Sequence, residues 1–154
     1  MITYLPVNTP DRAEQLRVLR NECAEWMTRD TRPVTRSRQR VFFEEKIATG
    51  KVEGFLAFDG ETPVAYGLLI WDNEGRAWSS TGVTPGRRGE GLGEAVTIEN
   101  VRRAHAHGVP MWAEVRQDNA GQQKICRRIG YQVTGVIQRN GHVIDVMRCD
   151  ELAP

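Results

Sequence analysis

The sequence predicts an α/β protein with a mixed, mostly antiparallel central sheet and helices on both faces. Three observations support this class. Short apolar runs alternate with segments of helical periodicity, hairpin-type turns separate neighbouring runs, and a glycine-rich turn leads from a strand into the longest helix. The expected element order is β-α-α-β-β-β-α-β-α-β-β, with one parallel strand–helix–strand crossover among antiparallel hairpins.

Size and composition indicate one domain over residues 1–154, because 154 residues with 40% hydrophobic content can bury a core. A net charge of +1 argues against a nucleic-acid or membrane partner. The three cysteines are too far apart for a zinc site or a disulfide framework, so we expect no metal and a reducing, cytoplasmic location. The N-terminus lacks signal-peptide features, and the longest apolar run is too short to span a bilayer.

The first half of the chain begins with an apolar run and a helix-start signal. Residues 8–11 combine a cap candidate with an early proline, and apolar residues continue at helical spacing to Trp26 or Met27. Pro33 interrupts this pattern, and Thr35 can cap a second helix. The expected elements are a strand over residues 2–7, a helix from about residue 10 to residue 26 or 27, and a helix from residue 35 to about 49.

The sequence pattern of the second half predicts strands separated by turns and by two helices. Turns at residues 59–61 and 72–75 separate three apolar runs, Gly108 and Pro110 stop the long helix, and Asn140-Gly141 predicts a tight hairpin. The expected elements are strands at 54–58, 64–71 and 77–83, a helix at about 91–107, a strand at 111–115, a helix at 119–129, and strands at 131–138 and 142–147.

The turn between the third strand of this half and the long helix is the most informative segment. Residues 83–93 read VTPGRRGEGLG. Glycines allow a close backbone approach and positive φ, and a helix start offers unpaired amides and positive dipole character. Together these features predict a seat for a phosphate or pyrophosphate group.

Three interpretations of this turn compete. Gly86 and Gly91 have the spacing of a Walker loop, but Leu92 and Gly93 follow instead of lysine and a hydroxyl residue, which excludes it. A dinucleotide fingerprint is matched in part, with Glu114 in place of the ribose-binding acid. The third interpretation is a plain strand–helix connection in which glycines permit tight packing.

Two motifs carry a resemblance to a known family. Arg88-x-x-Gly91-x-Gly93 resembles the pyrophosphate motif [QR]-x-x-G-x-[GA] of the GNAT N-acetyltransferases, and the stretch from Asn119 to Tyr131 is similar to their N-x-x-A-x-x-L-Y-x-K-x-G-F segment. The element order is also that of the family. The chain departs from the pattern at Gln122, where alanine is common, and at Cys126, where many members carry a tyrosine that protonates the departing thiolate.

The resemblance implies direct transfer of an acetyl group from acetyl-CoA to a primary amine of a small molecule, peptide or protein. It implies that the coenzyme parts the two central strands and that the Val83 amide polarises the thioester carbonyl. Glu114 is the best candidate for the base, and a solvated or ion-paired strand end is an equal alternative for it. Cys126 is the candidate acid or a small packing residue. The expected cofactor-binding residues are Gly82, Val83, Arg87, Arg88, Gly89, Glu90, Gly91, Leu92, Gly93, Glu94 and Asn119.

The acceptor and the assembly are less defined. Five arginines between Trp26 and Phe43 suit either an acceptor with a carboxylate or phosphate, or a solvated helix face, and the second interpretation is favoured. They are Arg29, Arg32, Arg36, Arg38 and Arg40. By family analogy the exposed final strands suit a homodimer. Because of Cys126, a non-catalytic acyl-CoA-binding module stands as the alternative function, with a nucleotide-dependent oxidoreductase third.

Overall fold

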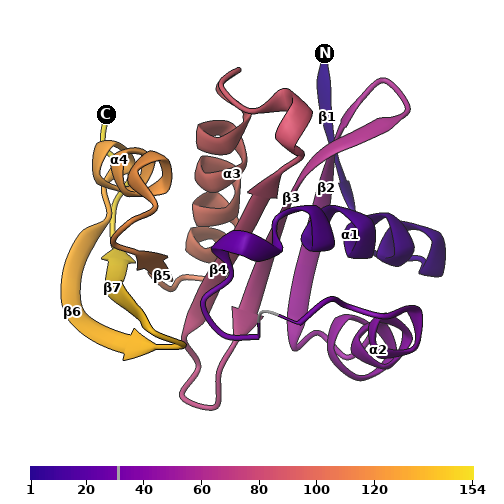
Figure 1. Cartoon of the computed structure of the whole chain (residues 1–154), viewed down its shortest axis with the longest axis horizontal. Helices are drawn as coiled ribbons and strands as arrows, with labels where there is room; N and C mark the ends of the chain where they lie inside the picture. The colour runs from indigo at the N-terminus through magenta and orange to yellow at the C-terminus, as the bar shows by residue number, and fades with distance from the viewer. Residues whose placement is uncertain (31) are drawn as a thin grey trace.

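The computed structural model describes residues 1–30 and 32–154 and shows a single twisted sheet with helices against it (Figure 1). The strands are β1 (Ile2–Pro6), β2 (Val52–Asp59), β3 (Thr62–Trp71), β4 (Ala77–Val83), β5 (Met111–Arg116), β6 (Gln132–Arg139) and β7 (His142–Cys149). The α-helices are α1 (Pro10–Glu22), α2 (Arg36–Phe42), α3 (Leu92–Ala106) and α4 (Ala120–Ile129). Shorter 3₁₀ segments are η1 (Ala24–Trp26) and η3 (Pro85–Arg87), and η2 (Phe43–Ile47) is a π-helical turn.

The strand order in the sheet is β1-β2-β3-β4-β5-β7-β6. Neighbouring strands are antiparallel, with the one exception of the parallel pair β4 and β5 that α3 connects. The mixed, mostly antiparallel sheet with its single parallel crossover confirms the predicted fold class.

Helices cover both faces because the strands alternate their apolar side chains. In β2, Leu56 packs in the same core cluster as Leu16 and Leu19 of α1. Its neighbour Phe55 packs with Val96 of α3 on the other face. Figure 1 shows α1 and α2 in front of the sheet and α3 behind it. The two faces therefore carry separate cores, one under α1 and one under α3 and α4.

Side-chain caps explain where three of the α-helices begin. Thr9 accepts a hydrogen bond from the Arg12 amide at 3.2 Å, and Thr35 accepts one from the Arg38 amide at 3.1 Å. Asn119 caps α4 in the same way. In the part of the chain that the structure describes, α3 alone among the α-helices has no side-chain cap.

The first two predicted helices are wrong in detail. The first α-helix ends at Glu22 and not at Trp26 or Met27, because the chain tightens into η1, where the Trp26 amide donates to the Cys23 carbonyl at 3.2 Å. The second is α-helical only to Phe42 and continues as the π turn η2. The predicted hairpin at Asn140-Gly141 is confirmed, with φ of 54° and 76° at its two residues.

Candidate cofactor cleft and acceptor face

The central parallel strands separate soon after they meet. Among the described residues, β4 and β5 pair only at Ala77–Met111 and Trp78–Trp112. The Thr84 amide donates to the Val64 carbonyl of β3 at 2.9 Å. Because successive amides of a strand point to opposite edges, the Val83 amide faces away from β3, toward the gap. The sheet thus contains an inner strand edge beside the glycine-rich turn.

The turn after β4 leaves main-chain amides open. Gly89 and Gly91 have φ of +83° and +84°, a conformation that residues with a Cβ rarely adopt. A Cβ added at either glycine would meet nothing within 4 Å. The first intrahelical bond of α3 runs from the Ala95 amide to the Gly91 carbonyl at 3.1 Å. The amides of Leu92, Gly93 and Glu94 therefore precede the helical ladder, where an anion would find donors.

The two arginines of the turn are held by carboxylates. Arg87 contacts Asp59 at 2.9 Å and Glu90 at 3.0 Å. These hydrogen bonds raise the pKa of Arg87, and the bond to Asp59 has the larger effect. Arg88 contacts Glu25 at 3.3 Å and donates to the Val83 carbonyl at 3.3 Å. Both predicted binding residues thus lie at the turn, and Arg88 also ties η1 to the end of β4.

Gly82 and Gly93 are glycines for a packing reason. A Cβ at Gly82 would lie 2.6 Å from the Tyr66 ring and 2.8 Å from the Cys23 sulfur. A Cβ at Gly93 would lie 3.3 Å from Ile125 of α4. The first close approach seats α1 against β4, and the second lets α4 pack near the start of α3.

The C-terminal half of α4 lies close to the start of α3. Asn119 uses its side-chain oxygen to accept from the Gln122 amide at 3.3 Å, which leaves its NH₂ group as the part able to contact a ligand. Arg128 of α4 forms two hydrogen bonds of 2.9 Å with Glu94 of α3. A third basic side chain, after Arg87 and Arg88, is thereby placed near the open amides.

Glu114 is ion-paired and almost fully buried. Its side chain is 5% exposed, and its Oε1 accepts from Arg29 at 2.6 Å. Its Oε2 accepts from Arg139 at the end of β6. Arg29 is 58% exposed, and its carbonyl accepts from Asn140 at the hairpin tip at 3.0 Å. The carboxylate therefore joins β5, the segment after η1 and the β6–β7 hairpin.

Cys126 is wholly buried in the core beneath α3 and α4. Burial raises the pKa of its thiol to about 12. Gln122 approaches its sulfur at 3.6 Å and the Thr97 hydroxyl at 3.4 Å. Gln122 and Cys126, the two residues that depart from the family pattern, therefore contact each other. Core packing accommodates the Cys126 side chain, which is shorter than the tyrosine of many members.

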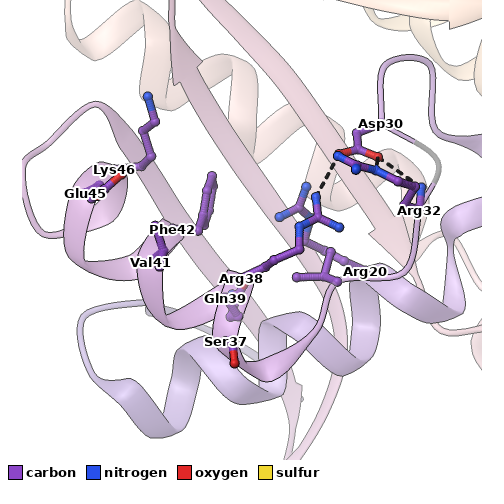
Figure 2. Close-up of a pocket in the computed structure, with 11 residues that line it drawn as sticks. Arg20, Asp30, Arg32, Ser37, Arg38, Gln39, Val41, Phe42, Glu45 and Lys46 are labelled. Carbon is purple, nitrogen blue, oxygen red and sulfur yellow. Dashed lines mark hydrogen bonds and ion pairs between the residues drawn. The ribbon is translucent and has the colours of Figure 1, made fainter.

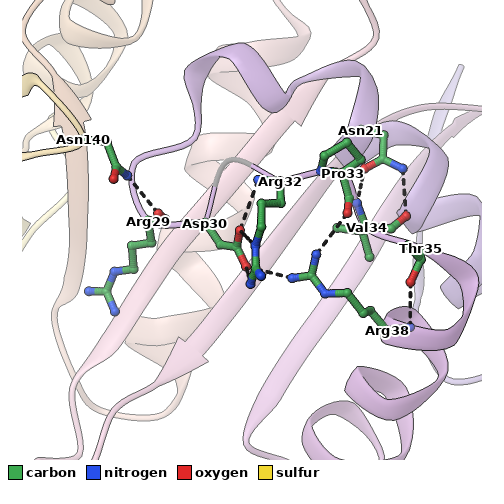
Figure 3. Close-up of polar contacts among 9 residues, drawn as sticks. All are labelled: Asn21, Arg29, Asp30, Arg32, Pro33, Val34, Thr35, Arg38 and Asn140. Carbon is green, nitrogen blue, oxygen red and sulfur yellow. Dashed lines mark hydrogen bonds and ion pairs between the residues drawn. The ribbon is translucent and has the colours of Figure 1, made fainter.

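All five arginines of the stretch are exposed, as the favoured interpretation expects, although only Arg36, Arg38 and Arg40 lie on α2. Arg29 and Arg32 precede α2, and Asp30 holds both Arg32, at 2.8 Å, and Arg38, at 2.7 Å (Figure 3). Figure 3 also shows Arg29 directed to the opposite side of this segment from the Asp30 cluster. The remaining two, Arg36 and Arg40, are exposed.

Sequence reasoning missed the residues that surround Glu114. Trp112 packs against Trp78 with ring centroids 5.6 Å apart, and Arg29 lies over Trp78 at 5.3 Å. Alternation along β5 would have found Trp112, because it lies two residues before Glu114 and shares its face. Arg139 carries no such signal, since its contact depends on the order in which β5, β7 and β6 pair.

Parted central strands above an uncapped helix start define a recognisable class of α/β protein, the acyltransferase type. Residues 16–131 match the family model described as the acetyltransferase (GNAT) family, and the chain belongs to that family. No curated protein matches the chain by sequence.

Solved structures share the fold at low sequence identity. The yncA protein of Salmonella typhimurium, assigned as an acetyltransferase and solved with its cofactor acetyl-CoA, has a TM-score of 0.83 and 17% identity, and the match covers 100% of this chain and 97% of that one. Ribosomal-protein-alanine N-acetyltransferase from Brucella melitensis has a TM-score of 0.80 and 18% identity over 96% and 98%. An N-acetyltransferase from Staphylococcus aureus Mu50 has a TM-score of 0.81 and 13% identity over 96% of each chain. In the described part of this chain, no helix has both the length and the apolar character that a membrane crossing requires.

Proposed function

We propose that the protein transfers the acetyl group of acetyl-CoA directly to a primary amine of a small molecule, peptide or protein. The observation that carries this proposal is the parting of β4 from β5 directly before the uncapped start of α3. Family membership and the fold shared with a structure that contains acetyl-CoA support the same conclusion.

The diphosphate of the coenzyme would lie on the amides of residues 89–94, where the chain offers donors and the positive end of α3. The pantetheine arm would run along the inner edge of β4, with the NH₂ group of Asn119 on its other side. The fit rests on the open space around Gly89 and Gly91, which a Cβ would narrow.

The transfer itself needs one bond made and one broken. The amine nitrogen attacks the thioester carbonyl, a C–N bond forms, the C–S bond breaks, and the sulfur takes up a proton. The Val83 amide donates to the carbonyl oxygen as negative charge develops there, a contact worth roughly 3 kcal/mol in the transition state.

Glu114 is our proposed base for the proton that the amine loses, directly or through water. Both of its oxygens are occupied by guanidinium groups, so one arginine must yield. Arg29 is the partner able to do so, because its side chain is 58% exposed and can move into solvent while Arg139 continues to compensate the carboxylate.

Cys126 is a poor acid for the departing thiolate. Its pKa of about 12 exceeds the roughly 8.5 of an ordinary thiol, so the proton transfer would be uphill by about 5 kcal/mol. We propose that Cys126 fills the core and that the thiolate leaves with a proton from water. The same burial keeps a non-catalytic acyl-CoA-binding module as the second candidate.

Two measurements separate these functions. Titration calorimetry with coenzyme A tests the cleft, and a thiol-release assay with acetyl-CoA and a panel of amines tests the transfer. The proposal expects heat of binding and amine-dependent release of thiol. Binding and thermal stabilisation by coenzyme A without release on any amine would favour the binding module, and stabilisation by NAD but not by coenzyme A would favour an oxidoreductase.

A further inference from the structure

Arg29 places its charge where the two central strands separate. Its Nε donates to the Glu114 carboxylate of β5 at 2.6 Å, and its guanidinium carbon lies 5.3 Å from the centre of the Trp78 ring of β4. The two strands stop pairing at Trp78–Trp112, and Glu114 lies two residues beyond Trp112 on the same face. The guanidinium therefore bridges β4 and β5 at the point of their separation.

The two groups that hold this guanidinium are themselves fixed by other contacts. The Trp78 indole donates to Asp72 at 2.9 Å and packs on Trp112 with ring centroids 5.6 Å apart. Glu114 is 5% exposed and also contacts Arg139. A carboxylate beside an aromatic ring attracts a cation, the first by charge and the second through its electron-rich face. The strands thus form a cation site that does not depend on the guanidinium now in it.

Arg29 can leave this site at little structural cost. Its side chain is 58% exposed, whereas its carbonyl is held by Asn140 at 3.0 Å. Exposed side chains change rotamer on the picosecond-to-nanosecond scale, so the guanidinium can move into solvent while the backbone stays in place. The occupant of the cation site is therefore exchangeable.

We infer that Arg29 occupies the subsite of the acceptor's ammonium group, between Glu114 and Trp78, and competes with the acceptor for it. This inference rests on the proposed acetyl transfer with Glu114 as the base. An arriving ammonium has the same charge as the guanidinium, displaces it, and gives one proton to Glu114, directly or through water, before the nitrogen attacks.

The inference also narrows the acceptor to a class. Aliphatic amines resemble the lysine side chain, whose pKa is about 10.4, and are therefore cations near neutral pH. Trp78 then determines specificity, since an aromatic ring favours a cation over a neutral group of the same shape.

The first test measures how removal of the competitor changes amine binding. In the thiol-release assay with saturating acetyl-CoA, Arg29→Ala should lower KM for the fastest amine of the panel by about fivefold or more and keep kcat within about twofold. The reason is that apparent affinity falls with the fraction of molecules in which the subsite is occupied. Arg29→Lys restores a competing cation, so its KM should lie between those of Arg29→Ala and the wild type.

Arg32→Ala is the matched control. Arg32 belongs to the same segment and is also ion-paired, but with Asp30 at 2.8 Å, where both line the cavity between α1 and α2 (Figure 2). Its KM should equal that of the wild type. Coenzyme A affinity, measured by calorimetry, verifies that each variant is folded.

The second test fills the emptied subsite with a probe. Methylguanidinium has the head group of Arg29, and N-methylurea is its neutral counterpart of similar shape. In Arg29→Ala we expect methylguanidinium to compete with the amine and N-methylurea to inhibit at least about fivefold more weakly. Adding Trp78→Leu should raise the inhibition constant of methylguanidinium by about threefold or more, because the cation–π contact is lost.

The outcomes are distinguishable. An unchanged or higher KM in Arg29→Ala, an equal fall in Arg32→Ala, or equal inhibition by the two probes would overturn this inference alone and leave acetyl transfer standing. Binding of coenzyme A with no thiol release on any amine would overturn the transfer and the inference with it. The comparison of the two probes decides even where Trp78→Leu does not fold.

Discussion

Buried polar groups near the cleft differ in their partners, and the partners determine what each can do. Glu114 has two guanidinium groups, so its charge is supported although it is almost fully buried. Cys126 has only the Gln122 amide and stays neutral. Their residue types made Glu114 and Cys126 candidates for proton transfer. Their surroundings favour Glu114 as a base and argue against Cys126 as an acid.

Replacement of Cys126 tests the assignment of this residue to the core. We expect Cys126→Ala to keep kcat within about tenfold of the wild type, because a thiol with a pKa of about 12 gives up its proton too reluctantly to serve as the acid. Steady-state kinetics with acetyl-CoA measure this. Cys149→Ala, another fully buried thiol, is the control. A drop of several orders of magnitude in the folded Cys126 variant alone would show that the thiol is the acid.

Replacement of Glu114 tests the base. Glu114→Gln keeps the shape of the side chain but cannot accept the proton, so we expect kcat to fall by about 10²-fold or more, with coenzyme A affinity unchanged. Asp118→Asn is the control, because Asp118 is a nearby exposed carboxylate that pairs with Arg116 at 2.7 Å. If kcat fell no further in Glu114→Gln than in Asp118→Asn, Glu114 would not be the base. Its role would then be structural, to join β5 to the segment after η1 and to the β6–β7 hairpin.

At the scale of elements, the start of α3 is the feature that distinguishes this chain from an ordinary α/β packing unit. Three α-helices of the described chain begin with a side-chain cap, and α3 begins with Gly91 in the left-handed region. A glycine there gives up the stabilisation of a capping side chain, which is typically about 1 kcal/mol. What it provides is backbone donors that no side chain blocks.

A change at Gly91 should weaken coenzyme A binding. Gly91→Val forces a β-branched residue into φ of +84°, so the turn must change shape and the amides lose their common direction. We expect the dissociation constant from calorimetry to rise by about tenfold or more. Gly75→Val is a matched control, because Gly75 has φ of +78°, has open space around it and lies in the β3–β4 turn at the other end of β4. Equal effects of the two variants would show that strain and not the cleft is responsible.

Element order was predictable from the sequence because each signal for it is local. Asn140-Gly141 supports a tight turn wherever it occurs, and Thr9 and Thr35 cap helices that start within three residues of them. The end of α1 was not predictable, since Trp26 continues the apolar spacing while the backbone has already tightened.

The site was predictable only where it is made of main chain. The glycine-rich turn consists of consecutive residues, and the uncapped start of α3 holds the amides that the motif predicts to bind the diphosphate. Arg139 contacts Glu114 only because β5, β7 and β6 pair in that order.

For the whole molecule, buried acids predict a loss of stability at alkaline pH. Burial raises the pKa of Cys126 and of Tyr66 to about 12 and that of Cys149 to about 11. In the unfolded chain a thiol titrates near about 8.5. A raised folded-state pKa contributes stability that is complete below the unfolded pKa and is lost as pH rises toward the folded value.

The free energy of unfolding should therefore fall between about pH 8.5 and pH 12, and Cys126 alone accounts for about 2 kcal/mol at about pH 10. Urea unfolding at about pH 7.5 and about pH 10 measures the loss. Between these two pH values, the free energy of unfolding of Cys126→Ala should fall by about 2 kcal/mol less than that of the wild type. An equal loss in the variant would mean that the thiol does not contribute.

Because β4 and β5 separate early, the sheet has unpaired strand edges in its interior as well as at its outer strands. An extended molecule that hydrogen-bonds along such an edge serves as a temporary strand. Under the proposed function, each arrival of the acyl donor would complete the sheet and each departure of the spent carrier would leave it incomplete. The rigidity of the protein would then rise and fall once per catalytic cycle, in step with the molecule it consumes.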